Sequence, residues 1–248
     1  MFNYTPPTNL LADRVILVTG AGDGIGRAAA QAFAAHGATV ILLGRTIRKL
    51  ESVYDAIEQA GHPRPAIYPL NLEGASPKDY EDLILTVEKE FGRLDGLLHN
   101  AAILGTLTPI EQYPINQWYQ VLQVNLNAPF LLTQACLKLL KRAPEASIIF
   151  TASGIGTRAR AYWGAYAVSK FATESLMQIL ADELEVNTSV RVNCINPGPV
   201  RTAMRASAFP GEDAAILPTP EVIMPAYLYL MGPESRTING QTINVQEK

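Results

Sequence analysis

The sequence has little cysteine and histidine, and the few residues of these types are scattered. Cys136 and Cys194 are the two cysteines among 248 residues and lie in separate apolar segments. This argues against a disulfide-stabilised scaffold and predicts two buried free thiols, as in proteins of a reducing compartment. The three histidines show no metal-ligand spacing, so the sequence predicts no metal site.

An excess of positive charge and a long hydrophobic run are also lacking. The chain has 20 basic and 23 acidic residues, with a net charge of -3, which offers no electrostatic footprint for nucleic acid or an anionic membrane. No apolar run is long enough to cross a bilayer. The opening residues MFNYTPPTNLLADR lack the basic and apolar regions of a signal peptide. These absences predict a soluble cytoplasmic protein with neither nucleic acid nor membrane as a partner.

What the sequence does contain is a regular alternation of apolar runs and amphipathic segments. Hydrophobic residues make up 48% of the chain and charged residues 17%, which is typical of a folded globular protein. Strands are expected at residues 14–19, 39–43, 66–70, 94–99, 147–151, 190–195 and 241–245. Helices are expected at residues 24–35, from after 43 to 59, and at 77–91, 114–141, 163–185 and 220–231.

The expected strands carry nearly continuous apolar residues, which indicates that both faces of the sheet are buried. The sequence therefore predicts a doubly wound α/β (Rossmann) architecture, with a seven-stranded, mostly parallel sheet between two layers of helices. No linker, repeat or low-complexity block divides the chain, so residues 1–248 are expected to form a single domain. The segment 209–220, FPGEDAAILPTP, is interpreted as a mobile loop.

A glycine-rich stretch, TGAGDGIG, joins the first expected strand to the first expected helix. Gly20, Gly24 and Gly26 are spaced differently from the common G-x-G-x-x-G fingerprint. Their position after a strand and at the start of a helix is nevertheless that of a diphosphate-binding turn, which needs residues without Cβ and free N–H groups. We therefore expect nucleotide binding here, in preference to a merely tight turn.

The stretch AYWGAYAVSK places Tyr166 and Lys170 four residues apart. On a helix they would share one face, about one turn apart, and the ammonium would favour a tyrosinate by charge attraction. Taken alone, the pair is better explained as two ordinary neighbours on a helix face.

Several motifs occur together in order along nearly the whole chain: TGAGDGIG at 19–26, HNAA at 99–102, Asn125, Ser153, YAVSK at 166–170 and NPGPVRT at 196–202. This ordered set resembles the classical short-chain dehydrogenases/reductases. The stretches LDGLLHNAA and RVNCINPGPVRTAMRASAF also resemble the YciK-type branch of bacterial oxidoreductases.

The resemblance implies roles for four residues. Tyr166 would be the general acid/base, and Lys170 would lower its pKa from about 10 and hold the nicotinamide ribose. Ser153 would orient the substrate oxygen. Asn125 would kink the long helix and relay protons to Lys170 through water, with Asn127 as the alternative asparagine in the same segment.

The resemblance also implies a nicotinamide cofactor. The residues expected to bind it are Gly20, Asp23, Gly24, Ile25, Gly26, Arg45, Asn71, Leu72, Asn100, Ala101, Ala102, Tyr166, Lys170, Pro197, Gly198, Val200 and Thr202. Two of these depart from the family pattern: Ala102 replaces a glycine, and Asn71 replaces an aspartate near the adenine. We expect cofactor binding to survive the added methyl group of Ala102. The role of Asn71 is expected to be weakened but kept, since an amide oxygen still accepts a hydrogen bond.

The residues after the second expected strand bear on which nicotinamide cofactor is used. An NAD-preferring site carries an acidic residue there, paired with the ribose 2′-hydroxyl. This chain has Gly44 and then Arg45, and a guanidinium suits a 2′-phosphate. NADP(H) is therefore predicted as the preferred cofactor, with NAD(H) as the alternative, although Asp23 stands where NADP-preferring relatives often carry a basic residue.

The substrate is predicted to be a small molecule with a carbonyl or alcohol group. Residues 203–217 are expected to form a lid over it, with Met204, Arg205 and Phe209 facing the site. Arg158 and Arg160 are candidates for gripping an anionic substrate, or are ordinary exposed loop charges.

Two functions remain open from the sequence. The first is an NADP(H)-dependent oxidoreductase, and the alternative is a non-catalytic dinucleotide-binding regulator or scaffold of the same fold. Because the family commonly pairs the helices expected at 114–141 and 163–185 between subunits, a homodimer or homotetramer is expected.

Overall fold

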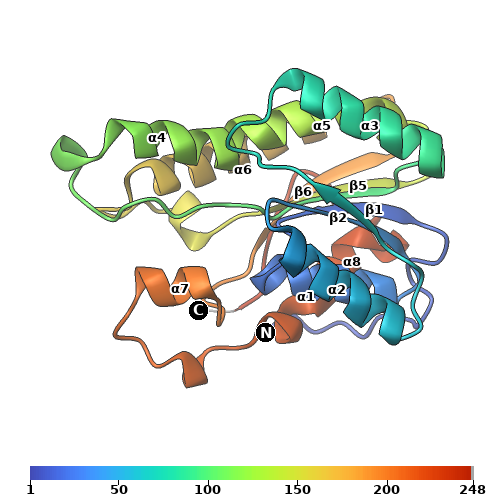
Figure 1. Cartoon of the computed structure of the whole chain (residues 1–248), viewed down its shortest axis with the longest axis horizontal. Coiled ribbons are helices and arrows are strands. Elements are labelled where there is room, and N and C mark those ends of the chain that lie inside the picture. The colour runs from blue at the N-terminus through green and yellow to red at the C-terminus, as the bar shows by residue number, and fades with distance from the viewer. Residues whose placement is uncertain (247–248) are drawn as a thin grey trace.

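A seven-stranded sheet forms the centre of the chain in the computed structural model, which describes residues 1–246 (Figure 1). The strand order is β3-β2-β1-β4-β5-β6-β7, and every neighbouring pair is parallel. The strands are β1 (Val15–Thr19), β2 (Thr39–Gly44), β3 (Ala66–Pro69), β4 (Gly96–His99), β5 (Ala146–Thr151), β6 (Val190–Asn196) and β7 (Thr242–Asn244). The predicted doubly wound architecture is confirmed, and the predicted domain of residues 1–248 extends two residues beyond those described.

The strands are buried on both sides because their side chains alternate between two cores. In β1, Val15 and Leu17 belong to one hydrophobic cluster, whereas Ile16 and Val18 belong to the other. Side chains of successive strand residues point to opposite faces, so a continuous apolar run supplies both cores at once. This is the physical reason that the strands show no alternation of polar and apolar residues.

Helices cover the two faces as separate layers (Figure 1). One layer holds α1 (Gly24–Ala35), α2 (Ile47–Gln59) and α8 (Met224–Met231); the other holds α3 (Pro77–Phe91), α4 (Ile115–Leu122), α5 (Ala128–Leu140) and α6 (Gly164–Glu185). The start of α3 follows its sequence signals, with Ser76 in a capping box and Pro77 in the first turn. It ends at Gly92, whose left-handed φ of 69° suits a residue without Cβ.

The expected helix 114–141 is not continuous, which corrects the sequence-based prediction. A π-helical turn, Gln123–Asn127, separates α4 from α5, and Asn125 lies at its centre. Pro129, four residues later, has no N–H group, so the Asn125 carbonyl lacks the donor that an α-helix would supply. The predicted kink at Asn125 is thus present in the form of a π turn, a feature frequently found at functional sites.

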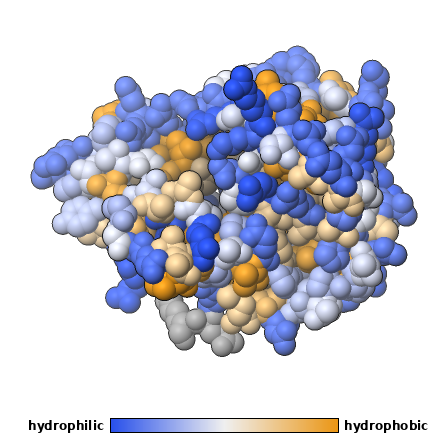
Figure 2. Space-filling model, turned by 60° about the horizontal axis from the view of Figure 1, so that its bottom comes forward, coloured by the Kyte–Doolittle hydropathy of each residue, from blue (hydrophilic) through white to orange (hydrophobic). Residues whose placement is uncertain are grey.

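One segment corrects the expectation that no apolar run is long enough to cross a bilayer. Residues Ala214–Met231 have a mean hydropathy of 1.2 over 18 residues. The segment is two 3-10 turns followed by α8, whose Ala226, Tyr227 and Leu230 are fully buried in the core. We therefore attribute its apolar character to core packing. Figure 2 shows hydrophobic residues only in small separate patches on the face that it presents.

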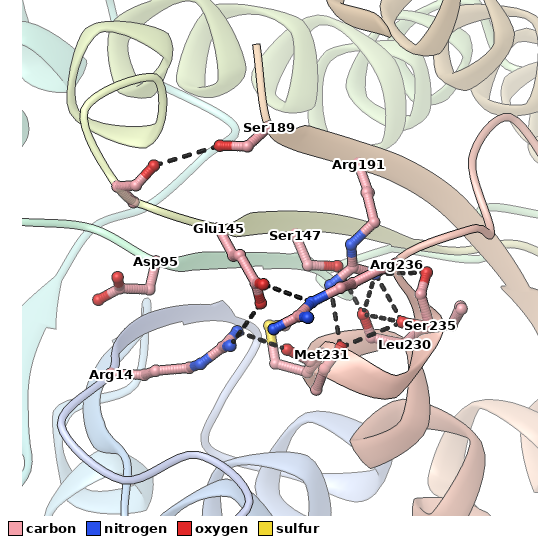
Figure 3. A network of polar contacts seen from close by, with 12 residues as sticks. Arg14, Asp95, Glu145, Ser147, Ser189, Arg191, Leu230, Met231, Ser235 and Arg236 are labelled. Atoms are coloured by element: carbon pink, nitrogen blue, oxygen red, sulfur yellow. Dashed lines mark hydrogen bonds and ion pairs between the residues drawn. The ribbon is translucent and has the colours of Figure 1, made fainter.

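A buried arginine fixes the end of α8 beneath the sheet (Figure 3). Arg191 lies near the start of β6 and is 6% exposed. Its guanidinium donates to the carbonyls of Leu230 and Gly232 at 3.0 Å, and to the carbonyl and hydroxyl of Ser235. Burial lowers the pKa of Arg191 to about 10, which leaves it charged at neutral pH. A cation here satisfies carbonyls at the C-terminus of the helix and complements its dipole.

Glu145 supplies the carboxylate of this same region (Figure 3). It pairs with Arg14 at 3.2 Å and with Arg236 at 2.5 Å. Arg14 also donates to the carbonyl of Met231 at 3.0 Å, the last residue of α8. These residues lie at the amino ends of the strands, away from the glycine-rich loop, and tie α8 to β1, β5 and β6.

Candidate active site

A large cleft opens at the carboxyl ends of the strands, where the strand order reverses between β1 and β4. Its volume is about 1510 Å³. In doubly wound sheets this is the place where ligands bind, because the flanking loops diverge there. The predicted residues that line it are Gly20, Asp23, Gly24, Ile25, Arg45, Asn71, Leu72, Asn100, Ala101, Ala102, Ser153, Tyr166, Lys170, Pro197, Gly198, Val200 and Thr202. Gly26 and Asn125 do not line it.

The glycine-rich loop is shaped so that no side chain fits at two of its positions. A Cβ on Gly26 would lie 2.2 Å from the carbonyl oxygen of Gly20, although Gly26 itself stands behind the cleft wall. Gly20 has a φ of 66°, and a Cβ there would lie 3.0 Å from the backbone of Ala101. The loop thus approaches β4 closely and leaves the N-terminus of α1 open to the cleft. This cradle fits the diphosphate of a dinucleotide.

The side chain of Asp23 is engaged by contacts within the protein. Its side chain caps α1 by accepting from the Gly24 N–H at 2.8 Å and forms an ion pair with Lys49 at 2.5 Å. The hydrogen bond from Lys49 is the largest influence holding the pKa of Asp23 below its usual value. Lys49 lines the cleft beside Arg45, so this end of the cleft holds two cations for one carboxylate.

The carboxyl ends of three strands are tied together by Asn100. Its backbone N–H donates to the Thr19 hydroxyl at 3.0 Å, and its side-chain oxygen accepts from the Thr151 hydroxyl at 3.3 Å. The preceding His99 is 5% exposed, bonds to Thr133 at 2.8 Å and stacks on a core phenylalanine. Burial lowers the pKa of His99 to about 3, so it is neutral at pH 7 and belongs to the core.

Tyr166 and Lys170 lie one turn apart on α6 and both line the cleft, as their spacing predicts. They are 7% and 5% exposed. The Lys170 Nζ lies 5.7 Å from the centroid of the Tyr166 ring and donates to the carbonyl of Thr151 at 2.6 Å, at the end of β5. The helix and the strand together therefore fix the direction of the ammonium.

Burial dominates the protonation of the pair. Burial raises the pKa of Tyr166, and hydrogen bonding to Ser153 only partly opposes it. Burial also lowers the pKa of Lys170 to about 8. For the protein groups by themselves the net shift of the Tyr166 pKa is therefore upward, because burial disfavours the charged phenolate, and a lowering of this pKa by Lys170 stays a prediction. At neutral pH the tyrosine carries its proton and most of the lysine is charged.

Ser153 is held directly after β5, at the floor of the cleft. Its Oγ accepts from the Ile155 N–H at 3.4 Å and so starts a short 3-10 turn, Gly154–Gly156. The hydroxyl is only partly buried and stands on the same side of the cleft as Tyr166. Its hydrogen bond with Tyr166 places the two hydroxyls together at this side of the cleft.

Asn125 supports the cleft from behind. Its side chain accepts from the Ile103 N–H at 2.8 Å and donates to the Ile103 carbonyl at 3.0 Å and to Ser169 at 3.1 Å. The alternative, Asn127, is exposed and bonds to Gln123 on its own helix. Asn125 is the asparagine that connects to α6.

Aromatic side chains form the other end of the cleft. The Trp163 ring lies 5.7 Å from the Tyr166 ring and 5.8 Å from the Phe209 ring. Phe209 follows a helix that the sequence did not predict, α7 (Ala203–Ala208), which begins at the N-cap Thr202. Trp163 and Met204 line the cleft with it. This part of the cleft is suited to an apolar group.

Lys49, Thr151 and Trp163 are site residues that the sequence did not reveal. Lys49 had one signal, its position four residues after Arg45. Thr151 acts through its backbone carbonyl, which no side-chain pattern reports. Trp163 stands next to the tyrosine motif, but its contact with Phe209 joins segments far apart in the chain.

Comparison with known proteins identifies the family of the chain. The family model described as short chain dehydrogenase matches residues 14–213. The uncharacterized oxidoreductase YciK of Escherichia coli K12 is 50% identical over 98% of this chain and 96% of its own length. A solved structure from Pseudomonas syringae that carries the same family name is 59% identical, with a TM-score of 0.96, covering 99% of this chain and all of the other.

A further solved structure, from Shigella flexneri 2a, is a short chain dehydrogenase complexed with NADP. It is 50% identical, with a TM-score of 0.94, and the match covers 97% of this chain and 100% of the other. The ordered motifs, the fold and these similarities agree: the chain belongs to the short-chain dehydrogenase/reductase family of oxidoreductases, in its YciK-type branch.

Proposed function

We propose that this enzyme transfers hydride between NADP(H) and a small carbonyl or alcohol substrate, with Tyr166 as the general acid/base. The observation that supports it best is the buried pair Tyr166 and Lys170, which opens onto the cleft beside Ser153. A proton donor, a cation and a hydroxyl thus converge where a carbonyl oxygen would be reduced.

The protonation states favour carbonyl reduction at neutral pH. A tyrosine whose pKa is raised by burial keeps the proton that it must give to the substrate oxygen. Ser153 would donate a hydrogen bond to that oxygen and stabilise the negative charge that develops on it. The nicotinamide, when bound, supplies or accepts the hydride. Lys170, held by Thr151, would bind the ribose hydroxyls and place its charge next to the phenol.

Asn125 would act as a positioning residue behind Lys170. Both of its side-chain polar atoms bond to protein groups, so its backbone carbonyl is the group left for a proton relay. Pro129 frees that carbonyl from the helical hydrogen-bond pattern. A water bound there would receive protons from Lys170 and pass them to solvent.

We propose NADP(H) as the preferred cofactor and NAD(H) as the alternative. The Shigella flexneri relative is complexed with NADP, and one from Escherichia coli CFT073 with NADPH. In this chain Arg45 is exposed at the end of β2 and lines the cleft, where its guanidinium would bind the 2′-phosphate.

The Arg45→Gln variant tests this preference. We expect its dissociation constant for NADPH to rise about 10- to 100-fold, the factor that corresponds to one charge-assisted contact. Its affinity for NADH should hardly change, because NADH has no 2′-phosphate. Arg48→Gln is the matched control, since Arg48 is exposed on α2 and does not line the cleft. Equal losses for both cofactors would contradict a contact with the 2′-phosphate.

A turnover assay distinguishes the proposed oxidoreductase from the alternative, a non-catalytic regulator of the same fold. NADPH oxidation is followed with a broad panel of aldehydes and ketones, and NADP reduction with the matching alcohols. The proposed function predicts turnover with at least one compound. Cofactor binding without turnover of any compound would favour the regulator.

We propose that residues 203–217 cover the substrate. Met204 and Phe209 line the cleft, and the segment that follows is tied back on itself. Arg205 forms a two-pronged ion pair with Glu212 at 2.6 Å, and the Arg201 guanidinium donates to the carbonyls of Ala214, Ala215 and Leu217. These bonds would make the lid move as one piece.

We also propose that the enzyme forms a homodimer or homotetramer through α4, α5 and α6. Large hydrophobic side chains that are 42% to 66% exposed gather on α4 and α6: Ile115, Tyr119, Val168, Phe171 and Ile179. Sedimentation velocity should show a species of at least twice the monomer mass, and a monomer alone would contradict the pairing.

We propose that the enzyme is located in the cytoplasm, since Cys136 and Cys194 are both free and buried.

A further inference from the structure

The substrate end of the cleft carries more positive than negative charge. Three arginines line it: Arg158, Arg160 and Arg205. The single carboxylate among the described lining residues is Asp23, which belongs to the cofactor end and is paired with Lys49. Among the described residues that line the cleft, those beside Tyr166 therefore include cations and no acidic group.

The three arginines differ in what they already bind. Arg205 is neutralised by the two-pronged pair with Glu212 and stacks on the Phe209 ring, 3.7 Å from its centroid. Within residues 1–246, Arg158 and Arg160 form no ion pair, and both are exposed. Two unpaired guanidinium groups therefore remain at the wall of the cleft.

The backbone that carries these two arginines is anchored against the catalytic helix. The 3-10 turn before them packs so closely on α6 that a Cβ on Gly156 would lie 2.9 Å from the Lys170 carbonyl. The Arg158 N–H donates to the Gly154 carbonyl at 3.2 Å, and the Arg160 carbonyl accepts from the Trp163 N–H. The loop is thus held at both ends by the segment that contains Ser153 and Tyr166.

Apolar aromatic surface also lines this end of the cleft. The rings of Tyr166, Trp163 and Phe209 follow one another at 5.7 Å and 5.8 Å, and Arg205 holds the outermost ring by stacking. Flat aromatic surfaces bind flat apolar groups, and a guanidinium binds a carboxylate through paired hydrogen bonds.

We propose that the substrate class is a carboxylate-bearing carbonyl compound, in which an apolar body separates the reacting carbonyl from the acid. The carbonyl would lie at Tyr166 and Ser153, the body along Trp163 and Phe209, and the carboxylate at Arg158 and Arg160. This inference rests on the proposed oxidoreductase function and names its substrate class. Two guanidinium groups that no carboxylate neutralises in residues 1–246 raise the local attraction for an anion.

The test compares two probes that share an aldehyde and a ring and differ in charge: para-formylbenzoate and its methyl ester. With NADPH, the kcat/KM of the wild-type enzyme for the acid should exceed that for the ester by about tenfold or more, as expected for charge-assisted contacts. In an Arg158→Gln, Arg160→Gln double variant, this acid-to-ester ratio should fall to near one. An Arg48→Gln variant should keep the wild-type ratio.

A binding measurement separates this inference from the proposed function. Calorimetric titration of both probes into the Tyr166→Phe variant with NADPH bound measures affinity without turnover. Tighter binding of the acid, lost in the double-arginine background, supports the carboxylate site even if no compound is turned over by the wild type. The inference would be overturned by equal affinity for acid and ester, by an unchanged preference for the acid in the double variant, or by binding of neither probe. Turnover of other carbonyl compounds would in that case still support the proposed oxidoreductase function.

Discussion

The Tyr166→Phe variant is expected to lose about 10²- to 10⁴-fold in kcat, the usual contribution of a positioned general acid or base. The substitution removes the hydroxyl and keeps the ring that packs against Trp163 at 5.7 Å. The affinity for NADPH should stay within about twofold, because the phenol accounts for at most a minor part of cofactor binding. A loss in kcat with unchanged cofactor affinity is the signature of an interaction made in the transition state.

The measurement is steady-state kinetics with the best substrate of the panel, together with NADPH titration. Tyr162→Phe is the matched control, because Tyr162 is 59% exposed, lies four residues away and does not line the cleft. It should retain wild-type turnover. If Tyr166→Phe kept more than about a tenth of the wild-type kcat, the loss of rate would be smaller than the loss expected on removing a general acid. Another group would then have to donate the proton.

The spacing of Tyr166 and Lys170 in the sequence predicts where the two side chains lie, but not how their pKa values shift. The interval to Lys170 correctly predicts that both side chains share a face of α6 and reach the same cleft. The sign of the pKa shift depends on how much water surrounds the pair. Burial comes from β5, the loop after it and α6 together, and a ten-residue stretch of sequence contains no information on that packing.

The pattern of apolar residues predicts the fold, whereas the main error of the prediction, one continuous helix at 114–141, comes from a local feature of the chain. Continuous apolar runs identify strands covered on both sides, so the parallel sheet follows from the pattern of apolar residues along the chain. The apolar pattern from 114 to 141 is compatible with one helix, because a π turn inserts a residue without removing the apolar positions around it. Pro129 was the available signal, since proline removes the hydrogen-bond donor four residues after Asn125.

The sequence does not predict ion pairs and hydrogen bonds between residues that are far apart in the chain. The contact between Asp23 and Lys49 joins the loop after β1 to the first turn of α2 and changes how the cofactor end is understood. Read alone, Asp23 opposes a 2′-phosphate; paired, it leaves Arg45 as the unopposed cation. Arg191 is a second case, because a charged residue within a strand gives no indication of the carbonyls that it satisfies.

Replacing Arg191 with methionine is expected to lower the free energy of unfolding by about 2–4 kcal/mol, through buried carbonyls left without their donor. The guanidinium donates to Leu230, Gly232 and Ser235 in the core (Figure 3). The loss is limited because Ser147 and Ser235 also donate to the Leu230 carbonyl. For a chain of this length the melting temperature should fall on the order of 5–15 °C.

Thermal and urea unfolding of the purified variant measure this effect, and Arg201→Met is the matched control. The Arg201 guanidinium also donates to three backbone carbonyls, but it is exposed, so water can replace it. Its removal should cost less than about 1 kcal/mol. Equal losses in the two variants would show that burial does not set the cost. Since Arg191 lies at the amino ends of the strands, the folded Arg191→Met enzyme should keep the wild-type kcat. A variant that is stable but inactive would mean that the end of α8 influences the cleft at the opposite end of the sheet.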